Sequence, residues 1–285
     1  MPADPSGAYE HIRVAPIAGA LGAEIGGIDL SKPLDDAVFA EVERALHEYL
    51  VLFFRDQRLS EARQKEFGRR FGPLNRHPFV DPDRTGRQDP EVFEVRHETG
   101  ETYIFGEGWH MDHTWKPVPL MGGILFAVEV PPWGGDTLFS NLYLAYETLS
   151  EGLRAALDGL RAVHAANPAL YVGDPNLSLT PAQIDAMRAV HPVVCRHPGT
   201  GRKLLFLHPH IVRRFEGWTE EESRPLLDFL CDHATRPEFT CRFRWRKGDV
   251  AFWDNRAVMH NPINDYRGFL RVMHRVAVEG TAAPA

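Results

Sequence analysis

The chain has 285 residues, a formal net charge of −7 at pH 7, 44% hydrophobic residues and 25% charged residues. This acidic balance argues against nucleic acid or an anionic membrane as the main partner, so any bound anion must be held by local arginines. No apolar run reaches the roughly 18 residues that a membrane span needs. The composition is that of an ordinary globular protein, and its length can be buried as one large domain.

Three cysteines, Cys195, Cys231 and Cys241, are an odd number without CxxC spacing. This number and spacing predict free thiols and argue against both a disulfide framework and a thiolate metal site. Residues 1–7 lack a basic region and an apolar segment, so no secretory signal is expected. We therefore expect a cytoplasmic protein in which residues 1–9, polar and rich in proline and glycine, are disordered.

The first ordered elements are expected soon after this start. In residues 12–28, short apolar runs broken by glycines predict small strands joined by tight turns. Residues 35–49 carry apolar side chains at helical spacing and are followed by a strand-like run over 50–54. Ser60 is a predicted N-cap for a second helix that ends near Arg70.

The rest of the chain reads as β structure. Short β-branched or aromatic segments bounded by Gly, Pro or Asp predict a sandwich or barrel; they are residues 122–130, 136–140, 203–207, 239–245, 249–253 and 269–278. No repeat and no linker divides the chain. We predict a single domain over residues 1–285, mainly β with flanking helices (α+β).

Helices are expected to interrupt these strands. Residues 145–160 carry leucines at helical spacing, and residues 219–233 open with a Thr219/Glu222 capping box. Residues 165–190 are expected to form a long insertion that contains one short helix after Thr180.

A histidine and an acid stand two residues apart at His110 and Asp112, between Trp109 and Trp115. On a strand, residues i and i+2 project from one face, so both side chains can converge on one ion. A distant histidine would complete a 2-His-1-carboxylate set with open coordination positions, which suits iron(II) better than structural zinc. By itself the triplet also fits a surface histidine near an acid. The two tryptophans and Trp253 are candidate pocket walls.

Two arginines lie close together after His260. On a predicted strand, Arg271 and Arg275 share one face, while Leu270 and His274 belong to the other. Buried arginines are costly unless each meets an anion. This pattern indicates either two bound carboxylates or similar groups near His260, or two ordinary ion pairs with internal acids.

At these residues the chain resembles the taurine dioxygenase family, also named for its 2,4-dichlorophenoxyacetate dioxygenase members. These are iron(II)- and 2-oxoglutarate-dependent oxygenases with a double-stranded β-helix (jelly-roll, cupin-like) fold. The resemblance covers residues 14–280. It rests on several motifs in the same order, at residues 51–57, 70–74, 109–112, 132–137, 253–260 and 271–275.

The resemblance implies specific roles at matching positions. His110, Asp112 and His260 match the family's iron ligands. Thr137 matches the hydroxyl that hydrogen-bonds the distal carboxylate of 2-oxoglutarate, and Arg271 matches the arginine that pairs with it. Iron(II) is then the expected metal, with 2-oxoglutarate and O₂ as co-substrates.

The resemblance also bears on the substrate. Arg275 and His77 match two contacts to the sulfonate of taurine, but Val80 and Gly106 replace a tyrosine and an asparagine that handle the taurine amine. A buried ammonium without those partners is penalised. We therefore expect a small organic anion without an amine: an alkyl sulfate, an alkylsulfonate or an aryloxyalkanoate.

The implied reaction is hydroxylation of a substrate carbon, with succinate and CO₂ as the other products. Alternatives are a hydroxylase or desaturase of an amino acid or natural-product intermediate on the same scaffold, and a non-catalytic anion-binding protein. A zinc hydrolase would lack the general-base glutamate that an HExxH motif supplies. The resemblance also implies a homo-oligomer, either a dimer or a tetramer.

Overall fold

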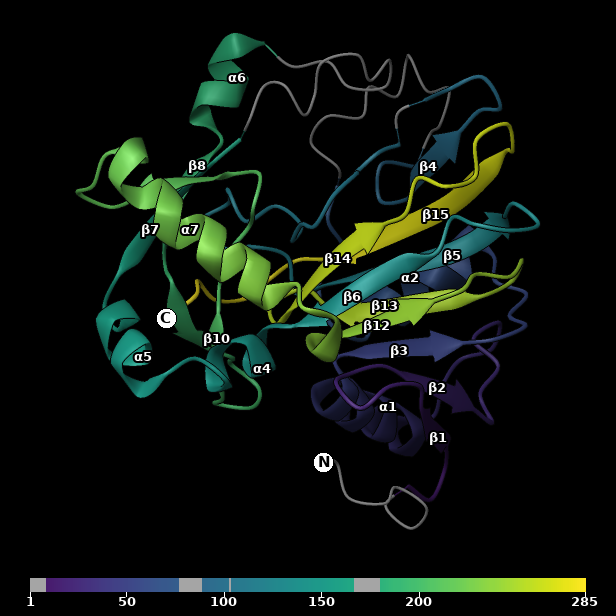
Figure 1. Cartoon of the computed structure of the whole chain (residues 1–285). Coiled ribbons are helices and arrows are strands. Elements are labelled where there is room, and N and C mark those ends of the chain that lie inside the picture. Colours follow the sequence, from purple (N-terminus) through teal and green to yellow (C-terminus); the bar gives the residue numbers. More distant parts are fainter. Residues whose placement is uncertain (1–8, 77–88, 103, 167–179) are drawn as a thin grey trace.

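A seven-stranded sheet forms the centre of the fold in the computed structural model, which describes residues 9–76, 89–102, 104–166 and 180–285 (Figure 1). The strand order is β1-β2-β3-β13-β5-β15-β4. Its strands are β1 (Arg13–Pro16), β2 (Ala23–Gly26), β3 (Val51–Phe54), β4 (Phe93–His97), β5 (Gly122–Glu129), β13 (Val250–Asp254) and β15 (Arg271–Val278). Because β13 pairs with both β3 and β5, late and early parts of the chain meet at its centre.

A second, three-stranded sheet packs against this one in the order β12-β6-β14. Aromatic rings fill the space between the sheets: Phe53 of the large sheet stacks on Phe243 at 3.9 Å between ring centroids, and Phe139 meets Phe53 edge-on at 5.7 Å. The predicted mainly-β, jelly-roll fold is confirmed. The strands of this sheet are β6 (Thr137–Asn141), β12 (Thr240–Phe243) and β14 (Val258–Pro262).

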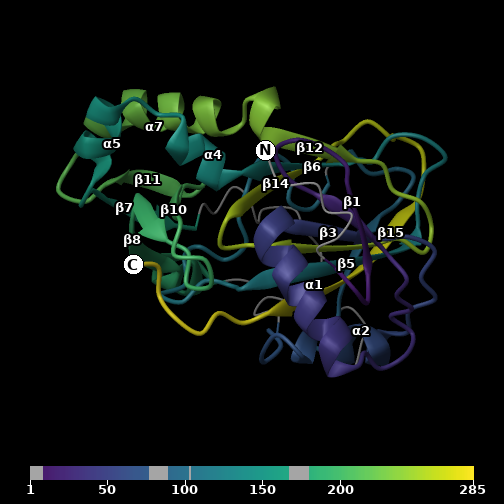
Figure 2. The ribbon, with the colours of Figure 1, turned by 90° about the horizontal axis from the view of Figure 1, so that it is seen from below.

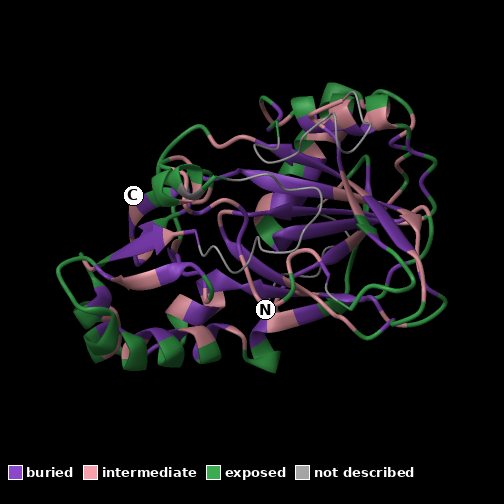
Figure 3. Cartoon of the chain, turned by 90° about the horizontal axis from the view of Figure 1, so that it is seen from above, coloured by how far each residue is buried: buried purple, intermediate pink, exposed green. Residues whose placement is uncertain are grey.

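Two helices, α1 (Asp36–Tyr49) and α2 (Glu61–Arg69), pack on the outer face of the large sheet (Figure 2). Both match the predicted helices, and the Ser60 side chain accepts a hydrogen bond from the Arg63 N–H as the N-cap (3.3 Å). Leu50 ends α1 in a left-handed conformation, with φ of 65°, and β3 begins at the next residue. The central strands β3 and β13 are fully buried and the edge strand β1 is mostly exposed, while the outward faces of the helices are exposed (Figure 3).

A smaller half lies beside the two sheets and contains a third sheet in the order β11-β7-β8 and a β9–β10 pair. The predicted helix over 219–233 is confirmed as α7, with its Thr219/Glu222 capping box. Besides the helices α4 and α5 described below, this half contains β7 (Arg161–Ala165), α6 (Pro181–Ala186), β8 (Arg188–Pro192), β9 (Val194–Arg196), β10 (Lys203–Leu205), β11 (Val212–Phe215), α7 (Glu220–Ala234) and the 3-10 helix η3 (Pro237–Phe239).

The single helix predicted over residues 145–160 is wrong. The chain forms two short helices there, α4 (Leu142–Glu147) and α5 (Glu151–Leu157). The Ser150 hydroxyl accepts a hydrogen bond from the Leu153 N–H and so starts a new helix, while Thr148 donates to the Leu144 carbonyl at the end of the first. Local side-chain hydrogen bonds of Ser and Thr outweigh the leucine spacing here.

The segment predicted as an insertion, residues 165–190, is partly structural. The short helix after Thr180 is confirmed as α6, but β8 begins at Arg188 and pairs along the whole of β7. Residues 167–179 lie outside the described residues, as does the start of the chain that was predicted to be disordered, except Tyr9. Cys195, Cys231 and Cys241 are free thiols, as predicted. In the described part of the chain, no helix is long and apolar enough to cross a membrane.

Candidate active site

His110 and His260 are joined directly by their backbones. The His110 N–H donates to the His260 carbonyl at 2.9 Å, and the His260 N–H donates to the His110 carbonyl at 2.8 Å, forming an isolated antiparallel bridge at β14. Directly opposed residues of an antiparallel pair project from the same face. The two imidazole rings therefore lie side by side, with their centroids 4.0 Å apart.

Asp112 completes a group of three. One potential ligand atom from each of His110, Asp112 and His260 lies within 4.8 Å of the others. The Asp112 Oδ2 atom is 3.9 Å from His260 Nε2. The prediction that His110 and Asp112 share the face of a strand is wrong, because only His110 is in a bridge and Asp112 lies in a turn. The convergence of the side chains is nevertheless observed.

The protonation of the histidines suits metal ligation. His110 Nδ1 donates to the Gly108 carbonyl at 2.9 Å, and this bond leaves Nε2 as the unprotonated nitrogen. Burial lowers the pKa of His110 and lowers the pKa of His260 well below the ordinary histidine value. Both rings are therefore neutral at pH 7 and can each offer a lone pair.

Arg271 and Arg275 project from β15 into the cavity that is also lined by His110, Asp112 and His260. The prediction that the two arginines share one face of a strand is therefore confirmed. Arg275 Nη2 lies 2.7 Å from Asp112 Oδ2, so this arginine already meets one internal acid. Arg271 is 4% exposed, and its Nε and Nη2 atoms are buried without a hydrogen-bond partner. Among the described residues Arg271 makes no ion pair, and burial lowers the pKa of its guanidinium. A buried guanidinium with two unpaired N–H donors is chemically suited to bind an anion.

The cavity opens to solvent and is lined by both polar and apolar groups. Its polar groups are the three clustered residues, the two arginines and Thr137. The remaining wall is apolar, made by Val95, Phe105, Leu125, Phe139, Trp253 and Pro262. Of the three tryptophans predicted as walls, Trp253 lines the cavity, whereas Trp109 and Trp115 are absent from the described lining. The Trp253 indole packs directly on Gly123 of β5, which has no Cβ. A Cβ at this position would lie only 2.3 Å from the indole.

Thr137 holds a fixed position at the beginning of β6. Its Oγ1 accepts a hydrogen bond from the Trp245 indole N–H at 2.9 Å, and both residues are buried. The Trp245 ring also lies 6.0 Å from the Arg271 guanidinium carbon. The threonine hydroxyl proton is therefore free to point into the cavity beside Arg271.

Replacing Thr137 with valine is expected to lower the free energy of unfolding by about 1–3 kcal/mol, because the buried Trp245 N–H loses its acceptor while side-chain volume is retained. Thr137→Ser keeps the hydroxyl and serves as the control. Urea unfolding measures both; equal midpoints for the valine and serine variants would contradict this account of the bond.

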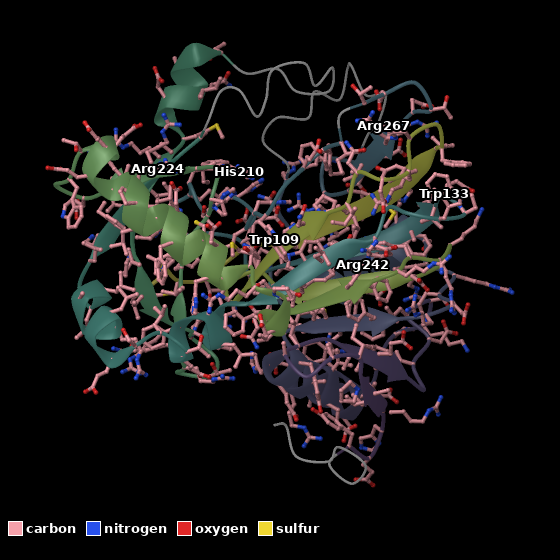
Figure 4. The ribbon with its side chains drawn as sticks, viewed as in Figure 1. Trp109, Trp133, His210, Arg224, Arg242 and Arg267 are labelled. Carbon is pink, nitrogen blue, oxygen red and sulfur yellow. The ribbon has the colours of Figure 1, made fainter. Side chains whose placement is uncertain are left out.

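Two histidines near the three clustered residues were not predicted from the sequence. His208, from the smaller half, lies with its ring centroid 6.2 Å from that of His110, and His210 lies 6.1 Å from His208. Figure 4 shows His210 and Trp109 between α7 and the strands β14 and β15, with Trp133 at the far end of β15. No spacing rule connects His208 to His110, because the two segments meet only through the fold. His77 and Val80 lie outside the described residues.

The chain matches the model of the family described as "Taurine catabolism dioxygenase TauD, TfdA family" over residues 13–277. It is 36% identical to an alkylsulfatase from Acinetobacter baylyi, covering 95% of this chain and 86% of the relative. It is also 36% identical to an alpha-ketoglutarate-dependent 2,4-dichlorophenoxyacetate dioxygenase from Cupriavidus pinatubonensis, covering 86% of this chain and 90% of the relative. A crystal structure of a taurine dioxygenase from Burkholderia xenovorans superimposes with a TM-score of 0.81 at 38% identity, covering 97% and 93% of the two chains. The chain therefore belongs to the taurine catabolism dioxygenase TauD, TfdA family.

Proposed function

We propose that this chain is an iron(II)- and 2-oxoglutarate-dependent dioxygenase that hydroxylates a carbon of a small organic anion. Alkyl sulfates, alkylsulfonates and aryloxyalkanoates are the proposed substrate types, with succinate and CO₂ as the other products. The observation that carries the proposal is the single cavity in which His110, Asp112 and His260 converge beside an unpaired, buried Arg271.

The residues present fit iron(II). Two neutral imidazoles and one carboxylate form a nitrogen and oxygen donor set without thiolate, which suits an iron centre with open positions. When bound, iron supplies the activation of O₂ that no side chain of the cavity can provide. The protein contributes the orientation of the ligands: the backbone bridge fixes the two histidines, and the Gly108 carbonyl fixes the tautomer of His110.

The residues also fit 2-oxoglutarate. In this proposal, Arg271 pairs with the distal carboxylate through its idle Nε and Nη2 donors, and the Thr137 hydroxyl donates to the same group. A planar guanidinium matches a carboxylate in a two-bond fork. The dicarboxylate would thus neutralise a charge that the described residues leave unpaired.

Arg275 is proposed to hold the anionic head of the primary substrate, together with His77. Its Nη2 atom contacts Asp112, and its Nε atom is buried without a hydrogen-bond partner. The guanidinium can therefore bind a second anion while it stays next to a metal ligand. This places the head of the substrate, and hence the carbon to be hydroxylated, close to the metal.

The cavity offers little to a substrate ammonium. Asp112, already a proposed metal ligand, is the only carboxylate among the described residues that line it. Gly106 has φ of +74°, and a Cβ there would lie 3.1 Å from His110 Nε2, so a side chain at position 106 would stand over the metal site. Because residue 106 is a glycine, it offers no polar side chain to the substrate and leaves room for an apolar substrate chain.

We expect 1-propanesulfonate to be a better substrate than taurine, which differs from it by an amine in place of a methyl group. An unpaired buried ammonium costs about 3 kcal/mol or more, which corresponds to a roughly 100-fold lower kcat/KM for taurine. Substrate-dependent succinate formation measures both. Equal values for the two sulfonates would contradict the proposed substrate class without affecting the cofactor assignment.

We further propose that the enzyme acts in the cytoplasm as one domain per chain and as a homo-oligomer. The three free thiols suit a reducing compartment. Gel filtration with light scattering tests the oligomer, whose expected forms are a dimer and a tetramer.

A further inference from the structure

Asn255 is fully buried and follows directly after β13. Its side-chain amide makes three hydrogen bonds to main-chain groups. Oδ1 accepts from the Asp112 N–H at 2.8 Å, and Nδ2 donates to the Asp112 carbonyl at 3.0 Å and to the Leu120 carbonyl at 3.2 Å. One side chain therefore binds both polar groups of the Asp112 backbone.

The three clustered residues are held in two different ways. His110 and His260 are fixed by their mutual backbone bridge. Asp112 lies in a turn, and among the described residues its main-chain hydrogen bonds both go to Asn255. The position of the carboxylate relative to the imidazoles therefore depends on the Asn255 amide.

Asn255 is itself held from both sides. Its own N–H donates to the Met121 carbonyl at 2.9 Å. The preceding Asp254 is fully buried and accepts hydrogen bonds from His197 Nε2 at 2.9 Å and from Arg256 Nε at 2.8 Å. Hydrogen bonds therefore hold Asn255 and the residue before it in place, and the Asn255 amide connects this segment to the turn at Asp112.

The chemistry at this position requires an amide. The side chain faces one N–H and two carbonyl oxygens, so it must accept once and donate twice. An aspartate of the same shape would place a carboxylate oxygen against two carbonyl oxygens in a buried site. Alanine would leave the N–H and both carbonyls without partners.

We propose that Asn255 is a positioning residue, which orients the Asp112 carboxylate and thereby sets the affinity of the site for its metal. This inference rests on the proposed metal site, yet metal binding can be measured without turnover. Groups that orient a ligand typically contribute about 10- to 100-fold to metal affinity.

Asn141 offers a matched control. It is 5% exposed, and its side chain also makes three hydrogen bonds: Oδ1 accepts from Tyr143 N–H and Leu144 N–H, and Nδ2 donates to the Ala20 carbonyl. It caps α4 and lies outside the described lining of the cavity. Its replacement should cost stability while leaving the metal ligands in place.

The test is the Kd of the metal-free full chain for Mn²⁺, measured from the EPR signal of the free ion, together with thermal unfolding of each metal-free variant. We expect Asn255→Ala to weaken Mn²⁺ binding by about 10- to 100-fold. We expect Asn141→Ala to lower the Tm comparably but to keep the wild-type Kd. An unchanged Kd in Asn255→Ala, or equal weakening in Asn141→Ala, would overturn the inference.

Asn255→Ser, which retains a small polar side chain, replaces the alanine variant if that variant does not fold. Coupling gives a further criterion: in an Asp112→Ala background, adding Asn255→Ser should not weaken residual Mn²⁺ binding further. An additive loss would overturn the inference. Absence of Mn²⁺ binding by the wild type would instead contradict the proposed metal site, and the inference with it.

Discussion

Replacing His110 with alanine is expected to abolish 2-oxoglutarate-dependent succinate formation and to weaken metal binding severely. Metal affinity should fall by more than about 100-fold, because removing a group that only orients a ligand already costs up to that much and here the ligand itself is removed. The fold should survive, since the bridge between residues 110 and 260 is made by backbone atoms that alanine retains. Succinate assay and Mn²⁺ titration of the same preparation measure the two effects.

His11→Ala is the control for this variant, because His11 is exposed and lies on the N-terminal side of β1, outside the described lining of the cavity. It should match the wild type in both assays. A His110→Ala protein that is folded, binds Mn²⁺ with wild-type Kd and still forms succinate would rule out His110 as a metal ligand.

The second large effect is expected at Arg271, where function and stability should change in opposite directions. Arg271→Met removes a charge-assisted interaction worth about 1.5–3 kcal/mol, which corresponds to a roughly 10- to 150-fold higher KM for 2-oxoglutarate. Without 2-oxoglutarate, the same variant should be more stable than the wild type, because an unpaired buried guanidinium is replaced by an apolar chain of similar length.

Steady-state kinetics and urea unfolding of the ligand-free protein check the two halves of this prediction. Arg267→Met is the matched control, because Arg267 is exposed in the turn before β15 (Figure 4), and it should change neither quantity. Arg271→Lys keeps the charge but not the two-bond fork, so its KM should lie between those of the methionine variant and the wild type. A lower stability of ligand-free Arg271→Met would mean that the guanidinium is already compensated in the free protein.

Local signals predicted the elements that are specified by their own residues. The Ser60 cap, the Thr219/Glu222 capping box and the helical spacing over residues 35–49 all correspond to observed helices. These features depend on side chains within a few positions of one another. At Ser150 two local signals conflict: the leucine spacing predicts one continuous helix, but the Ser150 cap begins a new one.

Elements defined by distant partners could not be predicted in this way. β7 and β8 are separated along the chain by an apparent insertion, and only their pairing makes them strands. The spacing of His110 and Asp112 fits a strand, but Asp112 lies in a turn. The His110 and Asp112 side chains still converge, because His110 is bridged to His260 and the Asp112 backbone is bound by the Asn255 amide. No sequence pattern around residue 112 reveals these two distant partners.

For the site, the resemblance to the family identified residues that the structure brings together: Thr137 and the two arginines line one cavity with the three proposed ligands. It did not anticipate the 2.7 Å contact between Arg275 and Asp112, nor the approach of His208 to His110. Both contacts join segments that are far apart in sequence, so they depend on tertiary packing. Their roles in catalysis stay predictions.

The most direct test of the iron and 2-oxoglutarate assignment is an anaerobic titration of the metal-free protein with iron(II) and then 2-oxoglutarate. It monitors the visible charge-transfer absorption that appears when the 2-oxo acid chelates iron(II). We predict a saturable band in the wild type that is absent in His110→Ala and requires more 2-oxoglutarate in Arg271→Met. A folded, iron-loaded wild type that shows no band at any 2-oxoglutarate concentration would contradict the assignment.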